Sequence, residues 1–327
     1  MNPLSTLFLF SLPCLITIFV CNSLLFLIPK LQIWDIPQAR SAHSYPISKG
    51  GGIGILAGFF TGYFFWYVCH PAVELLFSQI YALSALLFLA IFSLIDDIRS
   101  QNVWLKLGVQ IISSYVAMLS LSLSLPLTLF FSLICVILLN VINFMDGLNG
   151  LASLSMIISS AFLLKAHAQI AICLPLIVAL LCFLPWNFPK ARLFMGDVGS
   201  QSCALILCLA AGSLIISHQN QPIDIRIILL FPALLSGMIF DVFLTLCRRF
   251  FKKESLTKAH NTHLYQLAAR SKLLPPAYIS LLECGFVFLG GIIDLYAPLS
   301  LIVTLLLIPQ IIWSFIVLHF WKISQAR

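Results

Sequence analysis

The amino-acid sequence predicts an all-α protein that crosses a membrane many times. Of its 327 residues, 61% are hydrophobic and only 9% are charged, and the mean hydropathy is +1.06. Soluble domains carry roughly a quarter charged residues, so this deficit indicates a chain that is embedded in lipid. Apolar runs of about 20 residues, the helix length that crosses a ~30 Å hydrocarbon core, recur throughout. No interval leaves room for a soluble domain, which predicts one integral membrane domain over residues 1–327.

Polar residues, prolines and glycines divide the apolar sequence into about eleven spans. They lie at residues 4–28, 51–69, 79–95, 104–122, 125–140, 151–166, 168–186, 201–217, 226–246, 276–293 and 297–320. No basic residue precedes Lys30 and no clear cleavage site follows the first run, so we interpret it as a retained span. The ten cysteines show no paired C-x-x-C spacing, which favours small buried residues over a zinc site or a disulfide framework.

The long polar connections fall on alternate positions, which places all of them on one side of the membrane. They are residues 29–50, 96–103, 141–150, 187–200 and 247–275. All Lys and Arg except Lys165 and Arg226 lie on that side or in the C-terminal tail. The positive-inside rule therefore predicts cytoplasmic long loops, an outer N-terminus and an inner C-terminus. Basic residues that are spread between helices indicate contact with anionic lipids rather than with nucleic acid.

Seven acidic residues lie at or near the predicted cytoplasmic face. They are Asp35, Asp96, Asp97, Asp146, Asp197, Asp241 and Glu254. Hard oxygen ligands without clustered Cys or His suit Mg²⁺, which takes one or two protein carboxylates plus substrate phosphates; Mn²⁺ is the alternative ion. Glycines beside Asp146 and Asp197 are expected to let backbone amides approach a phosphate where a helix begins.

Each acidic segment also has an explanation that requires no function. Asp-Asp at a helix end and Gly-Asp-x-Gly-Ser before a helix can be caps, and Asp-Gly is a common turn. Their combination on one face, with Asn143 and Asn149 on either side of Asp146, favours a functional site. The pair His260 and His263, in the last basic loop, is suited to contact a phosphate or nucleotide, whereas Zn²⁺ requires further ligands. A lone acid inside a span, Glu283, is a further candidate.

Together these segments resemble the polyprenyl-phosphate N-acetylhexosamine-1-phosphate transferase family, which contains WecA-, WbpL-, TagO- and MraY-type enzymes. The matching segments occur in the family's order over nearly the whole chain. They are P-I-S-K-G-G-G at 46–52, the pair at 96–97 with Lys106 and Gln110 downstream, N-V-I-N-F-M-D-G-L-N-G-L at 140–151, N-F-P-K-A at 187–191 and F-M-G-D-V-G-S at 194–200. The segment A-H-N-T-H-L-Y-Q at 259–266 has neither the three histidines of MraY-type enzymes nor the H-I-H-H of WecA-type enzymes. It is most similar to the WbpL-type branch, which initiates O-antigen or related glycans.

The resemblance implies transfer of an N-acetylhexosamine-1-phosphate from a UDP-sugar to undecaprenyl phosphate in a bacterial inner membrane, with the active site facing the cytoplasm. The implied catalytic residues are Asp96, Asp97, Asp197, His260 and His263, and the implied metal ligands are Asp197, Asn143 and Asp97. The implied substrate-binding residues are His43, Lys49, Lys106, Asn143, Asp146, Gly147, Asn149, Asn187 and Arg249. A phosphate monoester loses its second proton near pH ~6, so we expect Asp96 and Asp97 to organise the metal and lipid phosphate rather than to act as a base. A homodimer is left open.

Three other classes are considered. A secondary transporter explains the spans and Glu283, but it predicts charges at mid-membrane and two repeated halves, which the sequence does not show. A CDP-alcohol phosphotransferase requires an Asp-Gly-x-x-Ala-Arg run, which residues 146–151 do not fit. A structural protein predicts no such set of polar loops. The sugar and the length of the polyprenyl chain are open.

Overall fold

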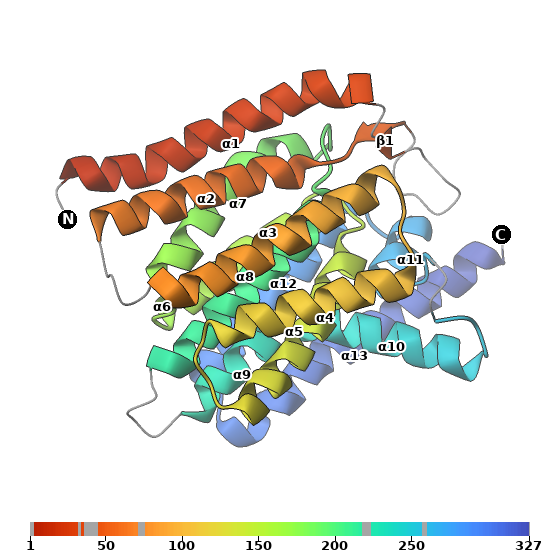
Figure 1. Ribbon diagram of the computed structural model, residues 1–327. Coiled ribbons are helices and arrows are strands. Elements are labelled where there is room, and N and C mark those ends of the chain that lie inside the picture. Colours follow the sequence, from red (N-terminus) through yellow and green to blue (C-terminus); the bar gives the residue numbers. More distant parts are fainter. Residues whose placement is uncertain are drawn as a thin grey trace.

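The computed structural model is a bundle of helices that run back and forth between two ends (Figure 1). It describes residues 3–31, 34–35, 45–70, 76–217, 224–256 and 260–326. The helices are α1 (Pro3–Leu31), α2 (Gly51–Cys69), α3 (Leu76–Ile98), α4 (Val103–Leu119), α5 (Leu125–Met145), α6 (Leu151–Lys165), α7 (Ile170–Asn187), α8 (Gly196–Ser217), α9 (Ile225–Leu234), α10 (Ser236–Phe251), α11 (Leu264–Arg270), α12 (Pro276–Tyr296), the short η2 (Leu299–Leu301) and α13 (Ile302–Gln325). Two two-residue strands, β1 (Trp34–Asp35) and β2 (Ile47–Ser48), pair antiparallel. The predicted all-α class is confirmed.

The helices have the length and the surface of membrane-spanning segments. Among the described residues, eight helices are long and apolar enough to cross a membrane, and the bent pair α9–α10 is a ninth candidate. The predicted spans at 104–122 and 151–166 fall on α4 and α6, which have only 17 and 15 residues. Large apolar side chains cover the outside, including Phe64 and Phe315, each 71% exposed, and such a surface suits lipid rather than water. A multi-pass membrane protein is therefore confirmed, whereas eleven crossings and their orientation stay predictions.

The predicted span at 226–246 is broken in the structure. Helices α9 and α10 meet at an angle of 62° around Leu235. Pro232 lies just before the break and the pair Ser236-Gly237 just after it, and both are common causes of sharp helix kinks. Helix α12 packs closely at this point, since a Cβ on Gly290 would lie 2.1 Å from the carbonyl oxygen of Ala233.

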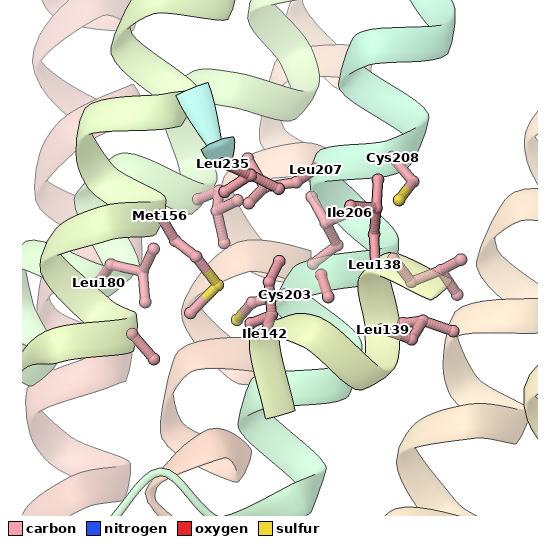
Figure 2. Close-up of a cluster of buried hydrophobic side chains, with 14 of the residues drawn as sticks. Leu138, Leu139, Ile142, Met156, Leu180, Cys203, Ile206, Leu207, Cys208 and Leu235 are labelled. Carbon is pink, nitrogen blue, oxygen red and sulfur yellow. The ribbon is translucent and has the colours of Figure 1, made fainter. Parts of the chain in front are cut away.

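Helix α8 lies in the middle of the bundle and is the most deeply buried of the long apolar helices that the structure describes. Its side chains pack against α5, α6 and α7, as the cluster that includes Ile142, Met156, Leu180 and Cys203 shows (Figure 2). Small residues along α8 let neighbouring helices approach closely. At its first turn, a Cβ on Gly52 of α2 would lie 2.3 Å from Cα of Gly199. The starts of α2 and α8 are thereby fixed side by side.

The segment after α7 connects these helix starts to the strand pair. The backbone N–H of Phe194 donates to the carbonyl of Ser48 at 2.8 Å, and Gly51 N–H donates to the carbonyl of Phe194 at 2.8 Å. The polar loops therefore gather near β1 and α11, on the right of the view (Figure 1). Described residues from all five long connections line one cavity at this end, as the alternation of the long loops predicted.

Candidate active site

A cavity of about 490 Å³ opens at the end of the bundle where the predicted segments meet. Small-molecule sites commonly have volumes of ~300–1,000 Å³. Eight predicted residues line the cavity: Lys49, Asp97, Asn143, Asp146, Gly147, Asn187, Asp197 and His260. Five lie outside its lining: Asp96, Lys106, Asn149, Arg249 and His263. The predicted residue His43 lies outside the described residues.

The carboxylate of Asp97, near the end of α3, caps the N-terminus of α8. Its Oδ1 accepts the backbone N–H of Asp197 at 3.1 Å, and its Oδ2 accepts that of Val198 at 3.0 Å. The negative charge also complements the dipole of α8. Gly196 has φ of 73°, and a Cβ there would lie 2.6 Å from Oδ2 of Asp97, so glycine permits this approach. Both oxygens of Asp97 therefore hold the segment that carries Asp197, a role that the sequence did not predict.

Asp96, the other member of the pair, forms an ion pair with Lys106 at the start of α4. Its Oδ1 also accepts the backbone N–H of Gln101 at 2.7 Å. The charges of Asp96, Asp97 and Lys106 all act on Asp197. Three carboxylates thus lie close together where α3, α4 and α8 meet, with Lys106 paired to Asp96 and the charge of Lys49 acting on Asp97.

The helix starts around the cavity are capped by the chain itself. Gly51, at the start of α2, donates its N–H to the carbonyl of Phe194. Gly150, which precedes α6, donates its N–H to Oδ1 of Asn187 at 2.9 Å. The amides at the start of α8 are taken by Asp97. At these helix starts, internal acceptors already occupy the amides of Gly150, Asp197 and Val198. The approach of other amides near Asp146 and Asp197 to a phosphate stays a prediction.

Asp146 lies in the turn between α5 and α6 and faces the cavity. Burial raises the pKa of its carboxyl well above the ordinary value; the charges of Asp197 and Asp97 raise this pKa further, and Lys49 lowers it. One turn earlier, Oδ1 of Asn143 accepts the hydroxyl of Ser200 at 2.9 Å, which fixes the asparagine against α8. A cation bound between these groups would offset the repulsion between the carboxylates.

Helix α11 forms another wall of the cavity and is held by Asp241 of α10. The carboxylate of Asp241, 2% exposed, accepts the backbone N–H groups of Leu264 at 2.8 Å and Tyr265 at 3.2 Å, and Nδ1–H of His263 at 3.2 Å. The hydroxyl of Tyr265 then donates to the carbonyl of Phe144 at 2.8 Å. These contacts connect α11 to the Asp146 turn, so both walls of the cavity are fixed to one another.

The two predicted histidines have different environments. His263 is 3% exposed and lies outside the cavity lining, whereas His260 lines the cavity with its ring centroid 4.8 Å from that of His263. Burial, together with the neighbouring His263 and Arg249, lowers the pKa of His260 to about 4. The imidazole of His260 is therefore neutral at pH 7. The neutral ring can hydrogen-bond a phosphate but carries no positive charge.

Three other predicted polar residues hold loops in place. Arg249 pairs with Glu254, with Nη1 and Oε2 3.3 Å apart, and it is absent from the cavity lining. Nδ2 of Asn149 donates to the carbonyl of Pro189 at 3.0 Å. Asn187 faces the cavity, but its Nδ2 donates to the carbonyl of Leu193 at 3.1 Å and its Oδ1 accepts from Gly150. These contacts account for most of the polar atoms of the three residues without a substrate, although Nε of Arg249 is buried without a hydrogen-bond partner within the described residues.

The intramembrane acid Glu283 also has a structural partner. Its Oε1 accepts the indole N–H of Trp313 at 2.9 Å, and its side chain is buried between α12 and α13. Hydrogen bonding of this kind is what a buried polar group requires. The functional interpretation of Glu283 is therefore unnecessary.

The donor atoms of the cavity fit Mg²⁺ in its usual protein setting. Within the described residues, no group of three or more His, Cys, Asp or Glu side chains is placed to hold a metal. Mg²⁺ commonly binds through one or two carboxylates and completes its coordination with phosphate oxygens and water. Asp197 and Asp146 offer carboxylates, and Asn143 offers an amide oxygen. These residues suit a cation that arrives with a phosphate rather than a cage made by protein alone.

Sequence reasoning missed the part of the cavity formed by α11 and the turn that follows it. Gln266, Arg270 and Lys272 line the cavity there. The side-chain Oε1 of Gln266 accepts the backbone N–H of His263 as part of a capping box at the start of α11. Histidine is not among the favoured capping residues, so the pattern at 263–266 gave no clear signal of a helix.

Comparison with known proteins supplies the family. Residues 79–217 match the model of glycosyl transferase family 4. This part of the chain is similar to members of that family. The glycosyl transferase family 4 segment carries Asp97, Asn143, Asp146 and Asp197, whereas the histidine loop lies beyond it. The resemblance to polyprenyl-phosphate sugar-phosphate transferases, predicted from the motifs, is thereby confirmed.

Curated relatives of the chain include several proteins named phospho-N-acetylmuramoyl-pentapeptide-transferase. That of Limosilactobacillus reuteri (strain DSM 20016) is 40% identical over 99 residues, which cover 27% of this chain and 30% of the relative. That of Limosilactobacillus fermentum is 36% identical over 129 residues, with 38% and 39% covered. That of Streptococcus pneumoniae (strain Hungary19A-6) is 35% identical over 139 residues, with 40% of each covered. The chain thus spans 30% to 40% of the length of these relatives.

Proposed function

We propose that the chain is a bacterial inner-membrane enzyme that transfers an N-acetylhexosamine-1-phosphate from a UDP-sugar to undecaprenyl phosphate and releases UMP. The observation that carries the proposal is the cavity at one end of an apolar bundle, lined by Asp97, Asp146 and Asp197 of the family segment. A donor from the cytoplasm and an acceptor from the bilayer can meet at such a place. We further propose that this end faces the cytoplasm, on the charge asymmetry of the loops.

The reaction joins two anions. A phosphate oxygen of the lipid forms a bond to the β-phosphorus of the donor, the bond from that phosphorus to the bridging oxygen breaks, and UMP leaves with the electron pair. Catalysis of phosphoryl transfer depends mainly on positioning and on neutralising charge. The lipid phosphate is already largely dianionic at neutral pH, because its second pKa is near ~6. No residue is therefore assigned as a general base.

The side chains then have distinct roles. Asp197 and Asn143 would hold Mg²⁺, which supplies charge neutralisation at the phosphates when bound. Asp97 positions Asp197 through the start of α8. Lys49 lines the cavity 3.7 Å from Asp35 and brings positive charge close to the phosphates. His260 offers a neutral hydrogen-bonding ring.

The sugar separates two versions of this function. We favour a GlcNAc-like sugar or a deoxy derivative such as FucNAc or QuiNAc, and a product that initiates O-antigen or a related glycan, because the segment at 259–266 resembles the WbpL-type branch. The second candidate is transfer of phospho-N-acetylmuramoyl-pentapeptide, the activity named for the curated relatives. That version would place the chain in peptidoglycan synthesis.

A donor panel tests the proposal. Purified protein is incubated with undecaprenyl phosphate, Mg²⁺ and radiolabelled UDP-GlcNAc, UDP-GalNAc, UDP-FucNAc, UDP-QuiNAc or UDP-N-acetylmuramoyl-pentapeptide. Label in the lipid phase with one N-acetylhexosamine supports the first version, and label with the pentapeptide donor alone supports the second. Folded protein that transfers neither class of donor would contradict both and favour a transporter.

A further inference from the structure

Arg270 is the last residue of α11 and lies at the edge of the cavity. Its guanidinium carbon is 4.9 Å from the centroid of the Trp321 ring on α13, within the ~6 Å over which a cation is attracted to an aromatic face. One of its amino groups donates a long hydrogen bond of 3.4 Å to the carbonyl of Asn261. Within the part of the chain that the structure describes, no ion pair involves Arg270. Most of its donors thus remain available to a ligand.

The position of Arg270 is fixed although its side chain is exposed. Helix α11 has only seven residues, too few for stability on its own. Asp241 binds its first turn and Tyr265 connects it to Phe144. The Trp321 ring then fixes the direction of the guanidinium. A cation held in this way loses little conformational freedom on binding an anion.

The other cations close to the carboxylates are paired with acids. Lys106 pairs with Asp96, and Lys49 lies near Asp35. Arg270, together with Lys272 in the following turn, lines the part of the cavity formed by α11. The carboxylates come from other elements: Asp97 from α3, Asp146 from the α5–α6 turn and Asp197 from α8. The cavity thus has an acidic part and a basic part. Arg270 and Lys272 therefore offer positive charge to an anion on the α11 side of the cavity.

Trp321 indicates which substrate passes this point. It lies in the last part of α13, between the exposed apolar side chains Phe320 and Ile323 and next to Lys322. Tryptophan at the end of a membrane-spanning helix marks the level of the lipid headgroups. A phosphate attached to a lipid sits at that level with its hydrocarbon chain in the bilayer. A nucleotide-sugar, which arrives from water, has no need of a contact there.

We propose that Arg270, supported by Trp321, binds the phosphate monoester of the acceptor lipid. The proposal rests on the proposed function and deepens it, because it separates the place where the acceptor phosphate enters from the acidic part of the cavity. The guanidinium offers two parallel N–H donors to phosphate, which a lysine cannot reproduce. Arg270 therefore sets the affinity for the acceptor and leaves the donor diphosphate to other residues.

Two substrates titrated separately provide the kinetic test. Arg270→Gln is expected to raise the KM for undecaprenyl phosphate about tenfold or more, the loss typical of a charge-assisted hydrogen bond, and to leave the KM for the UDP-sugar unchanged. Arg270→Lys is expected to give a KM for undecaprenyl phosphate between those of the wild type and Arg270→Gln. Trp321→Leu is expected to raise the KM for undecaprenyl phosphate and to leave that for the UDP-sugar unchanged. Lys252→Gln, which removes an exposed cation outside the cavity lining, is the matched control and is expected to match the wild type.

A binding measurement keeps the test independent of turnover. Farnesyl phosphate, farnesol and UDP are titrated into wild-type and Arg270→Gln protein in detergent, with intrinsic fluorescence as the signal. We expect the variant to bind farnesyl phosphate at least about tenfold more weakly and to bind UDP as the wild type does. If Arg270→Gln weakened the binding of UDP but not that of farnesyl phosphate, Arg270 would be assigned to the donor and the proposal would be overturned. Binding of each of the three ligands by the variant with the same affinity as the wild type would overturn it as well. A wild type that binds farnesyl phosphate through Arg270 but transfers no sugar would contradict the proposed function alone.

Discussion

Replacing Asp97 by asparagine separates a positioning role from direct catalysis. The side chain of Asp97 accepts one backbone N–H on each oxygen, at 3.1 Å and 3.0 Å. Asparagine keeps one acceptor and turns an NH₂ group towards the other N–H. A hydrogen bond to a charged group contributes about 1.5–3 kcal/mol, and a charge at a helix N-terminus about 0.3–1 kcal/mol. Reduced repulsion with Asp197 offsets part of the loss, so we expect the free energy of unfolding to fall by about 1–2 kcal/mol.

Thermal unfolding and transfer kinetics, measured on the same detergent preparation, check this expectation. Asp97→Asn is expected to lower the unfolding midpoint and to lower kcat about tenfold or more, since about 1.4 kcal/mol of misplacement in the transition state has that effect. Asp197→Asn is the comparison. It removes the carboxylate proposed to hold the metal, so it should abolish transfer. It keeps the backbone N–H that Asp97 accepts, so the unfolding midpoint should not fall. An inactive Asp97→Asn with an unchanged midpoint would refute the capping role.

Four further substitutions test other contacts. A Cβ on Gly147 would lie 2.1 Å from the Tyr265 hydroxyl, so Gly147→Ala should lower stability and activity; Tyr265→Phe should restore part of both, and a double-mutant cycle without coupling would contradict this. The pKa of His260 is lowered from 6.5 to about 4, so its contribution to stability is complete above pH 6.5 and is lost as the pH falls towards 4. Between pH 6.5 and 4, the unfolding midpoint of His260→Gln should therefore fall less than that of the wild type. An equal dependence of the two midpoints on pH would contradict the lowered pKa of His260. Glu283→Gln keeps an acceptor for Trp313, so transfer should persist.

Most of the helices could be predicted from the sequence, because the length of an apolar run is a local property of the chain. Each predicted span falls on a helix or, for 226–246, on the bent pair. Pro232 and Ser236-Gly237 were visible in the sequence as causes of the bend. Composition alone did not decide how far α4 and α6 extend across a membrane, because their apolar runs are short. The many small residues of α8 indicate that the helix is buried. They do not indicate that it lies in the middle of the bundle.

The side chains of the site were harder to predict, because their partners are distant in the sequence. The motif search found the acidic segments, and eight of the predicted residues share one cavity. It did not show that Asp97 caps a helix 100 residues later, since that requires the relative position of α3 and α8. Arg249 and His263 were expected at the substrate but pair with Glu254 and Asp241. Arg270 was missed because a helix as short as α11 leaves little periodicity in the sequence.

Transfer of radiolabel from the UDP-sugar panel to undecaprenyl phosphate tests the central claim most directly. The assay compares purified wild type with Asp197→Asn, each with Mg²⁺ or with EDTA. The proposed function predicts label in the lipid phase for one donor, lost on adding EDTA and absent in the variant. Transfer that persists in EDTA or in Asp197→Asn would contradict the assignment of Asp197 as the metal-binding carboxylate. Folded protein with no transfer from any donor would contradict the enzyme itself.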